Sequence, residues 1–236
     1  MSFEAVGIDL TRQGLREHAQ GLDLSWANSV TLHHTAAPSL AQRPHGLSSQ
    51  HIVNIADYYE NTLHWSSGPH LFIDDSERPF KGMTSLSQRG VHARSYNYNS
   101  IGIEVLGNYD HENANSGRGF VCWQNAARAV SILLKQLGLM PDKRSILFHR
   151  DDPKTNKTCP GKNISKDAFL ELVRRADDQG STIADTPGSG NEEIFQALDW
   201  QLDQIHKEDP RDADEKFDQS ERLKNIKFLF EKLANL

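Results

Sequence analysis

The stretch SVTLHHTAAP, residues 29–38, decides the fold class and points to the chemistry of this chain. Its first half alternates into an apolar run that predicts a β-strand, and the strand ends on the pair His33 and His34. Successive side chains of a strand point to opposite faces of a sheet, so only one of the two imidazoles can reach a given site. The stretch therefore predicts a strand that delivers one histidine to the end of a sheet.

A second segment, LFHRDDPKTNKTCPGK at residues 147–162, carries matching chemistry. His149 ends another short apolar run, and Cys159 follows ten residues later in a Lys-Thr-Cys-Pro-Gly turn. Two imidazoles and one thiolate are ligands that zinc prefers, and three protein ligands leave the open fourth position that distinguishes a catalytic zinc from a structural one. The alternatives are packed, hydrogen-bonded histidines and a disulfide between Cys159 and Cys122.

The chain around these segments alternates strand and helix patterns. Strands are expected at 28–34, 70–74, 100–107 and 145–149, and helices at 49–59 with Ser49 as the cap, at 120–137 and at 165–177 with Ser165 as the cap. Residues 77–99 are polar and rich in turn formers. Interleaved strands and helices predict an α/β fold with a single mixed central β-sheet flanked by helices.

The composition changes after residue 178. Residues 179–192 are small, polar and contain Pro and Gly, which is typical of a linker. Residues 193–236 show two apolar stripes at helical spacing, which predicts a C-terminal helical appendage, either a hairpin or helices docked on the main domain or a partner chain. Residues 181–236 contain 13 acidic and 7 basic side chains, so this tail accounts for the whole net charge of −6.

Composition also excludes several classes of protein. Without a basic patch, nucleic acid is not an expected partner, and two cysteines in 236 residues do not make a disulfide framework. No apolar run is long enough to span a bilayer, so we expect no membrane insertion. The N-terminal residues 1–13 do not have the pattern of a secretory signal peptide, so we expect synthesis in the cytoplasm.

Four segments in the same order resemble one known family. HHTA, the glutamate strand in SIGIEVLGNY, His149 and the Lys-Thr-Cys-Pro-Gly turn are similar to the zinc-dependent N-acetylmuramoyl-L-alanine amidases. This amidase type 2 family includes phage lysins, bacterial amidases and animal peptidoglycan recognition proteins, and the resemblance covers about residues 28–176. It implies that His33, the first histidine of the pair, binds one Zn²⁺ per chain together with His149 and Cys159. Residues 1–178 would then form the catalytic domain.

Glu104 and Lys157 are the candidate catalytic side chains. Glu104 interrupts an apolar strand, where a buried carboxylate without a partner would be costly, and the family has a catalytic glutamate at this position. It would take a proton from water and pass it to the leaving amine. Lys157 lies two residues before Cys159, where its charge could face the oxyanion of the tetrahedral intermediate. The alternatives are a glutamate that faces water on an edge strand and an ordinary solvated lysine.

The segment VHARSYNYNS, residues 91–100, resembles a His-Ala-Gly-x-Trp/Tyr-Asn stretch of the family, with Arg94 in place of the common Gly. The match implies that His92 and Asn97 contact the stem peptide, although both could instead stabilise the loop. One departure concerns Pro69, which stands where many members have Tyr. The departure removes a possible second acid or oxyanion donor and puts more weight on Glu104.

The resemblance implies a peptidoglycan hydrolase that cleaves the amide between N-acetylmuramic acid and L-alanine of the stem peptide. The expected partner is peptidoglycan or a muropeptide, with a protein partner or self-association possible through residues 193–236. The expected setting is a phage or prophage endolysin, or an antibacterial lysin, that acts on the cell wall after release. The alternatives are a non-catalytic peptidoglycan-binding module, a cytosolic amidase that recycles muropeptides, and a thiol peptidase with Cys159 as nucleophile and His149 as base.

Overall fold

The computed structural model describes residues 5–179, and all structural statements concern this part of the chain. In chain order its elements are β1 Asp9–Leu10, α1 Arg12–Gln20, β2 Ser29–His34, α2 Ser49–Asn61, β3 Leu71–Ile73, β4 Phe80–Gly82, β5 Ser100–Val105, α3 Gly117–Leu137, β6 Ile146–Phe148, a 3-10 turn at His149–Asp151, and α4 Lys166–Gln179.

The six strands form one sheet in the order β1-β4-β3-β5-β2-β6. β3, β5, β2 and β6 run parallel to one another, whereas β4 pairs antiparallel with both β3 and β1. The mixed sheet and its flanking helices confirm the expected α/β fold. Because β5, β2 and β6 are parallel neighbours, their carboxyl ends meet at one edge of the sheet, where βα connections commonly build a site.

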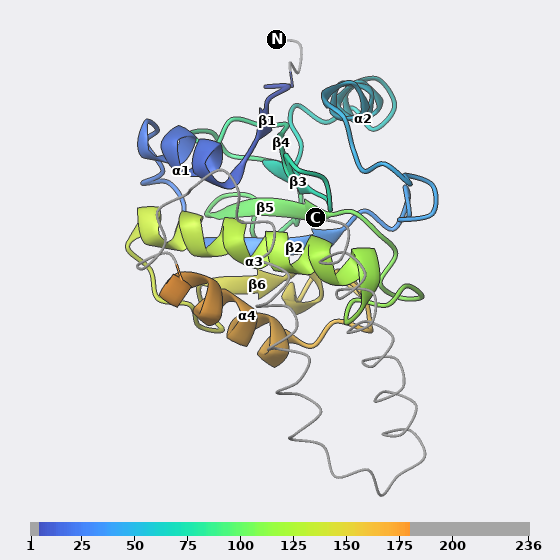
Figure 1. The fold of residues 1–236 in the computed structure, drawn as a ribbon. Coiled ribbons are helices and arrows are strands. Elements are labelled where there is room, and N and C mark those ends of the chain that lie inside the picture. The colour runs from blue at the N-terminus through green and yellow to red at the C-terminus, as the bar shows by residue number, and fades with distance from the viewer. Residues whose placement is uncertain (1–4, 180–236) are drawn as a thin grey trace, which may run out of the picture. The chain divides into compact units, whose positions relative to one another are not determined.

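One face of the sheet carries the main hydrophobic core. Alternate residues of the central strands, such as Leu32 and Ile103, pack there against buried side chains of α1, α3 and α4. Figure 1 shows α3 and α4 crossing this side of the sheet. α3 contributes most, since its buried side chains cover almost its full length. It ends at Leu137, directly before Gly138, whose φ of 67° is unfavourable for residues with a Cβ.

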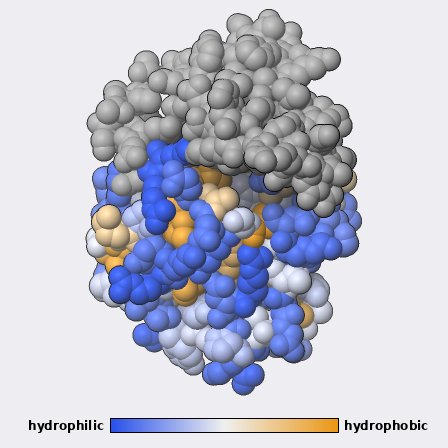
Figure 2. Space-filling view, turned by 90° about the horizontal axis from the view of Figure 1, so that it is seen from below, coloured by the Kyte–Doolittle hydropathy of each residue, from blue (hydrophilic) through white to orange (hydrophobic). Residues whose placement is uncertain are grey.

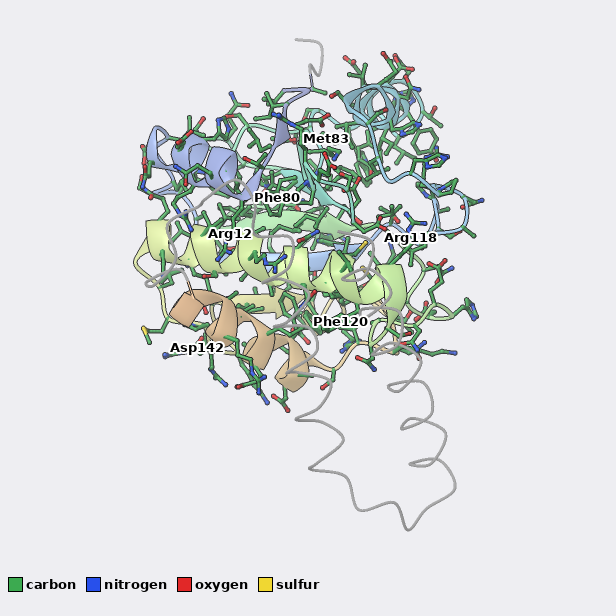
Figure 3. The ribbon with its side chains drawn as sticks, in the orientation of Figure 1. Arg12, Phe80, Met83, Arg118, Phe120 and Asp142 are labelled. Carbon is green, nitrogen blue, oxygen red and sulfur yellow. The ribbon has the colours of Figure 1, made fainter. Side chains whose placement is uncertain are left out.

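The opposite face carries only a small second core beside α2. Ile52 and Ala56 of α2 pack there against Phe72 of β3 and Met83. Phe80 of β4 belongs to the main core, whereas Met83, just beyond the strand, belongs to the second core; both are labelled in Figure 3. The rest of this face is free to carry polar side chains from β2 and β5.

Three details of the structure differ from the sequence expectations. The segment 77–99, expected to be rich in turns, contains the short strand β4, and the N-terminal elements β1 and α1 were not foreseen. The cap of α2 is Ser48 and not Ser49, because the Ser48 hydroxyl accepts the hydrogen bond from His51 N–H and the His51 ring accepts one from Ser48 N–H. Ser165 does lie at the start of α4 and accepts a hydrogen bond from Ala168 N–H.

The linker expected at 179–192 and the helical tail expected at 193–236 lie outside the described residues, apart from Gln179 at the end of α4. Both remain predictions. Figure 2 shows a face of the molecule on which hydrophilic residues predominate and hydrophobic ones lie in small areas. Among the described helices, none combines the length and the apolar character that crossing a bilayer would require.

Candidate active site

β2 and β5 bring His33 and Glu104 together on the sheet face opposite α3. The two residues are register partners in the parallel pair, and Glu104 Oε1 lies 4.0 Å from His33 Nδ1. His34 points to the other face, where its Nδ1 accepts a hydrogen bond from Tyr109 N–H and its ring stacks on Tyr109. Strand alternation thus selects His33 as the histidine that reaches this face.

His149 and Cys159 approach His33 from the segment that follows β6. His33 Nδ1 lies 3.0 Å from His149 Nδ1 and 3.7 Å from Cys159 Sγ. One ligand atom from each of the three residues lies within 4.8 Å of the other two. A tetrahedral zinc with usual bond lengths separates its nitrogen and sulfur ligands by roughly 3.3–3.6 Å. The separations of 3.0 and 3.7 Å lie within about 0.3 Å of this range, so the three side chains could hold a zinc ion.

Polar contacts from both sides hold the turn that carries Cys159. Arg150 N–H donates to Cys159 O, and the Arg150 guanidinium donates to the carbonyl oxygens of Gly161 and Ile164. Asp110 accepts from the Thr158 hydroxyl and from Lys162 N–H. These contacts explain how a loop residue can hold a fixed position opposite two histidines.

Gly161 lets the same turn pack closely on the chain beside it. Its φ is 119°, and a Cβ there would lie 2.6 Å from the backbone carbonyl carbon of Tyr109. Residues with a side chain rarely adopt this φ, so glycine is required for both conformation and space.

Burial sets the protonation of the site. Burial lowers the pKa of His33 well below its usual value, and the nearby His92 and His149 lower that pKa further. Burial also lowers the pKa of His149. Both imidazoles are therefore neutral near pH 7, which is the state that binds a metal. Burial raises the pKa of Glu104 to about 8, although the charge of Lys157 acts in the opposite direction.

Both cysteines are free thiols, so no disulfide joins Cys122 and Cys159. Burial raises the pKa of Cys159 above its usual value, and Glu104 adds to the shift. A protonated thiol is a poor nucleophile, which disfavours the interpretation as a thiol peptidase.

These groups line one cavity of about 620 Å³. Lys157 lies at its rim with an exposed side chain, and Pro69 forms part of the wall. A second part of the wall is aromatic and consists of Tyr58, Tyr59 and Trp65. The cavity thus joins three atoms that could hold a metal, a carboxyl group and a cation to an apolar surface.

The sequence matches the family model of the N-acetylmuramoyl-L-alanine amidases over residues 24–162, more than half of the chain. The chain belongs to this family. A curated relative, peptidoglycan-recognition protein 2 of Holotrichia diomphalia, is 31% identical over 81 residues, which are 34% of this chain and 42% of the relative. The match thus spans less than half of that relative's length.

Two solved structures are similar to this amidase family member over part of its length. Drosophila peptidoglycan recognition protein SD is 23% identical with a TM-score of 0.47, and covers 58% of this chain and 76% of its own. The endolysin N-acetylmuramoyl-L-alanine amidase LysCS from Clostridium intestinale is 19% identical with a TM-score of 0.48, and covers 64% of this chain and 86% of its own.

His92 and Asn97 of this amidase domain have partners inside the protein. His92 is only 9% exposed, and its ring nitrogens lie 3.1 Å from His33 Nε2 and 2.9 Å from Ser100 O. The Asn97 side-chain oxygen accepts hydrogen bonds from the backbone N–H groups of His92 and Ala93. These contacts stabilise the loop, and His92 also lines the cavity, so substrate contact stays a prediction for both residues.

Three residues that brace the candidate site were missed in the sequence: Arg150, Asp110 and Asp152. Asp152 is buried and accepts a hydrogen bond from Ser95 N–H, which connects the segment after His149 to the His92 loop. Polar residues in loops usually face water, so their identity alone gave no signal. The one available signal was position in the sequence: Arg150 and Asp152 lie within three residues of the predicted ligand His149.

Proposed function

We propose that this chain is a zinc-dependent peptidoglycan hydrolase that cleaves the amide between N-acetylmuramic acid and L-alanine of the stem peptide. One observation carries the proposal: the ligand atoms of His33, His149 and Cys159 lie within 4.8 Å of one another, and the Glu104 carboxyl lies 4.0 Å from His33 in the same cavity. The match to the amidase family supports the choice of bond.

His33, His149 and Cys159 would hold the metal through two nitrogens and one sulfur. When bound, zinc supplies Lewis-acid chemistry and a nucleophile near neutral pH. The depressed pKa values of the two imidazoles keep their lone pairs available. The raised pKa of the Cys159 thiol means that a cation must stabilise its thiolate, which is what a divalent metal does.

Glu104 would move the proton in the reaction. Its carboxylate takes a proton from the attacking water as the C–O bond forms, and the resulting acid gives that proton to the nitrogen as the C–N bond breaks. Burial raises the pKa of Glu104 to about 8, and the charge of Lys157 favours the carboxylate form. Glu104 can therefore both accept and donate a proton near neutral pH. Lys157, at the rim, would stabilise the negative charge that develops on the carbonyl oxygen.

The direct test is digestion of purified sacculi by the full chain, with the products identified by mass. We expect stem peptides that begin with a free L-alanine amine, together with glycan strands whose lactyl groups are unsubstituted. A zinc chelator should abolish the reaction, and added zinc should restore it. Binding to sacculi without new products would support the non-catalytic module, whereas chelator-resistant cleavage would support a thiol peptidase.

We further propose that the enzyme acts on the cell wall as an endolysin or antibacterial lysin, with residues 1–178 as the catalytic domain. The alternative is a cytosolic amidase that recycles soluble muropeptides. Comparing the rate on intact sacculi with the rate on soluble muropeptides separates the two, because a recycling enzyme should prefer the soluble substrate by a large factor.

A further inference from the structure

A chain of hydrogen bonds runs from His33 through His92 to the backbone of β5. His92 Nε2 lies 2.9 Å from Ser100 O, and a carbonyl oxygen can only accept, so this nitrogen carries a proton. The His92 ring is only 9% exposed and lies against the rings of His33 and His70, two side chains without negative charge, so it is neutral. Its Nδ1 atom is therefore left with a lone pair.

That lone pair determines which nitrogen of His33 carries the proton. His92 Nδ1 lies 3.1 Å from His33 Nε2, and it can only accept, so His33 Nε2–H is the donor. A neutral imidazole has one N–H, and His33 Nδ1 is consequently bare. This is the atom that lies 3.0 Å from His149 Nδ1 and 3.7 Å from Cys159 Sγ.

Two further residues hold the His92 ring in place. Gly102, in the middle of β5, leaves space for it, because a Cβ at that position would lie 2.5 Å from His92 Cγ. Asn97 accepts the hydrogen bond from His92 N–H at 2.9 Å and so fixes the backbone from which the ring extends. With both ring nitrogens occupied, His92 has no ring donor or acceptor left for substrate.

We propose that His92 is a positioning residue of the metal site: its ring fixes the Nε2–H tautomer of His33 and thereby aims the Nδ1 lone pair of His33 at the metal. Gly102 and Asn97 contribute to this role because they hold the His92 ring in position. The proposal rests on the metal site of the proposed function, but not on the amide bond that is cleaved. Partners of this kind typically contribute 10–100-fold to metal affinity.

The first test measures the zinc dissociation constant by competition with a chelator, without substrate. His92→Leu removes the acceptor and should weaken zinc binding about 10–100-fold. His92→Asn keeps an oxygen near the position of Nδ1 and should bind zinc within a few-fold of the wild type. Gly102→Ala, which displaces the ring, should resemble His92→Leu. His64→Asn, at an exposed histidine with a φ of 57° that Asn tolerates, is the matched control and should change nothing.

The second test needs no variant. Two-bond ¹H–¹⁵N spectra of the metal-free protein, labelled at histidine, report which ring nitrogen carries the proton. We expect Nε2–H for both His33 and His92. A proton on His33 Nδ1, or wild-type zinc affinity in a folded His92→Leu protein, overturns the proposal. Tight zinc binding with the expected variant effects but no amidase activity would refute the proposed function and leave the positioning role intact.

Discussion

At the scale of single residues, the candidate site contains ionisable side chains whose burial costs folding free energy. A carboxyl group that is 13% exposed, with burial raising its pKa to about 8, is an expensive feature of β5. Glu104 faces His33 across the parallel pair, and Lys157 is the cation that favours its ionised form. The arrangement is costly for stability and suited to proton transfer.

Glu104→Gln is expected to separate metal binding from turnover. The amide keeps the shape of the side chain but cannot accept the proton, so the rate on sacculi should fall about 10²–10⁴-fold. Zinc content, measured by atomic emission on the purified variant, should stay at one per chain. Glu77→Gln, at an exposed glutamate away from the cavity, is the control and should keep full activity. Full activity in Glu104→Gln would contradict the assigned role.

Cys159→Ser is expected to lose the metal together with activity. A hydroxyl is a much weaker zinc ligand than a thiolate, so the purified variant should contain far less than one zinc per chain. Cys122→Ala is the matched control, since Cys122 is buried in the main core and its loss should lower stability but leave zinc stoichiometry unchanged. Unchanged zinc content in Cys159→Ser would rule out the ligand assignment.

At the scale of elements, the sequence predicted strands and helices correctly where apolar residues recur at a regular spacing. The strands at 28–34 and 100–107 and the helix at 120–137 each bury a regular stripe, and the structure has β2, β5 and α3 there. β4 was not predicted because it is only three residues long and has a lysine, Lys81, at its centre. The buried Lys81 is paired with Asp74, which the sequence alone does not reveal. Short elements that are stabilised by their neighbours leave no period to detect.

α1 was missed for a related reason. Only Leu15 and Ala19 of its nine residues are buried, and Gly14 lowers its intrinsic helix propensity. The same limit applied to the site. The candidate ligands could be found from their order in the chain, whereas the braces Arg150, Asp110 and Asp152 could not, because most of their partners are backbone groups that only the folded turns bring close.

The turn that carries Cys159 gives a prediction at this scale, with a control built into the fold. Gly161 and Gly138 both have positive φ, but only Gly161 packs against Tyr109, whereas a Cβ at Gly138 would meet nothing within 4 Å. Gly138→Ala should cost about 1–2 kcal/mol of stability through its backbone conformation alone. Gly161→Ala should cost more and should also weaken zinc binding, because the turn must move. Urea unfolding and chelator competition measure the two effects; equal stability losses with equal zinc affinity would contradict this account.

At the scale of the whole described domain, the two faces of the sheet divide the work. One face is covered by α1, α3 and α4 (Figure 1) and supplies most of the apolar burial. The other face carries the small core beside α2 and the cavity. Buried ionisable groups can be tolerated on the second face because the first stabilises the fold. The stability of the metal-free domain should therefore report directly on those groups.

Glu104 should make the metal-free domain less stable as pH rises. Its pKa is about 8 in the folded protein and 4.5 in its ordinary state, so the folded protein holds a proton that the unfolded chain releases between these values. The contribution of Glu104 to the free energy of unfolding is fully present below about pH 4.5 and is lost as pH rises through about 8. The buried histidines have lowered pKa values, so below about pH 6.5 they make the domain more stable as pH rises. They are present in both the wild type and the Glu104→Gln variant, so their effect cancels in the comparison.

Glu104→Gln removes this dependence without removing the side chain. In excess chelator, the variant should match the wild type near pH 4.5 and exceed it increasingly toward pH 8.5, by an amount on the order of a few kcal/mol. Urea unfolding followed by tryptophan fluorescence at intervals across this range gives the two curves. Parallel curves would mean that the Glu104 carboxyl is not desolvated in the folded domain, and its position in the cavity would then have to be revised.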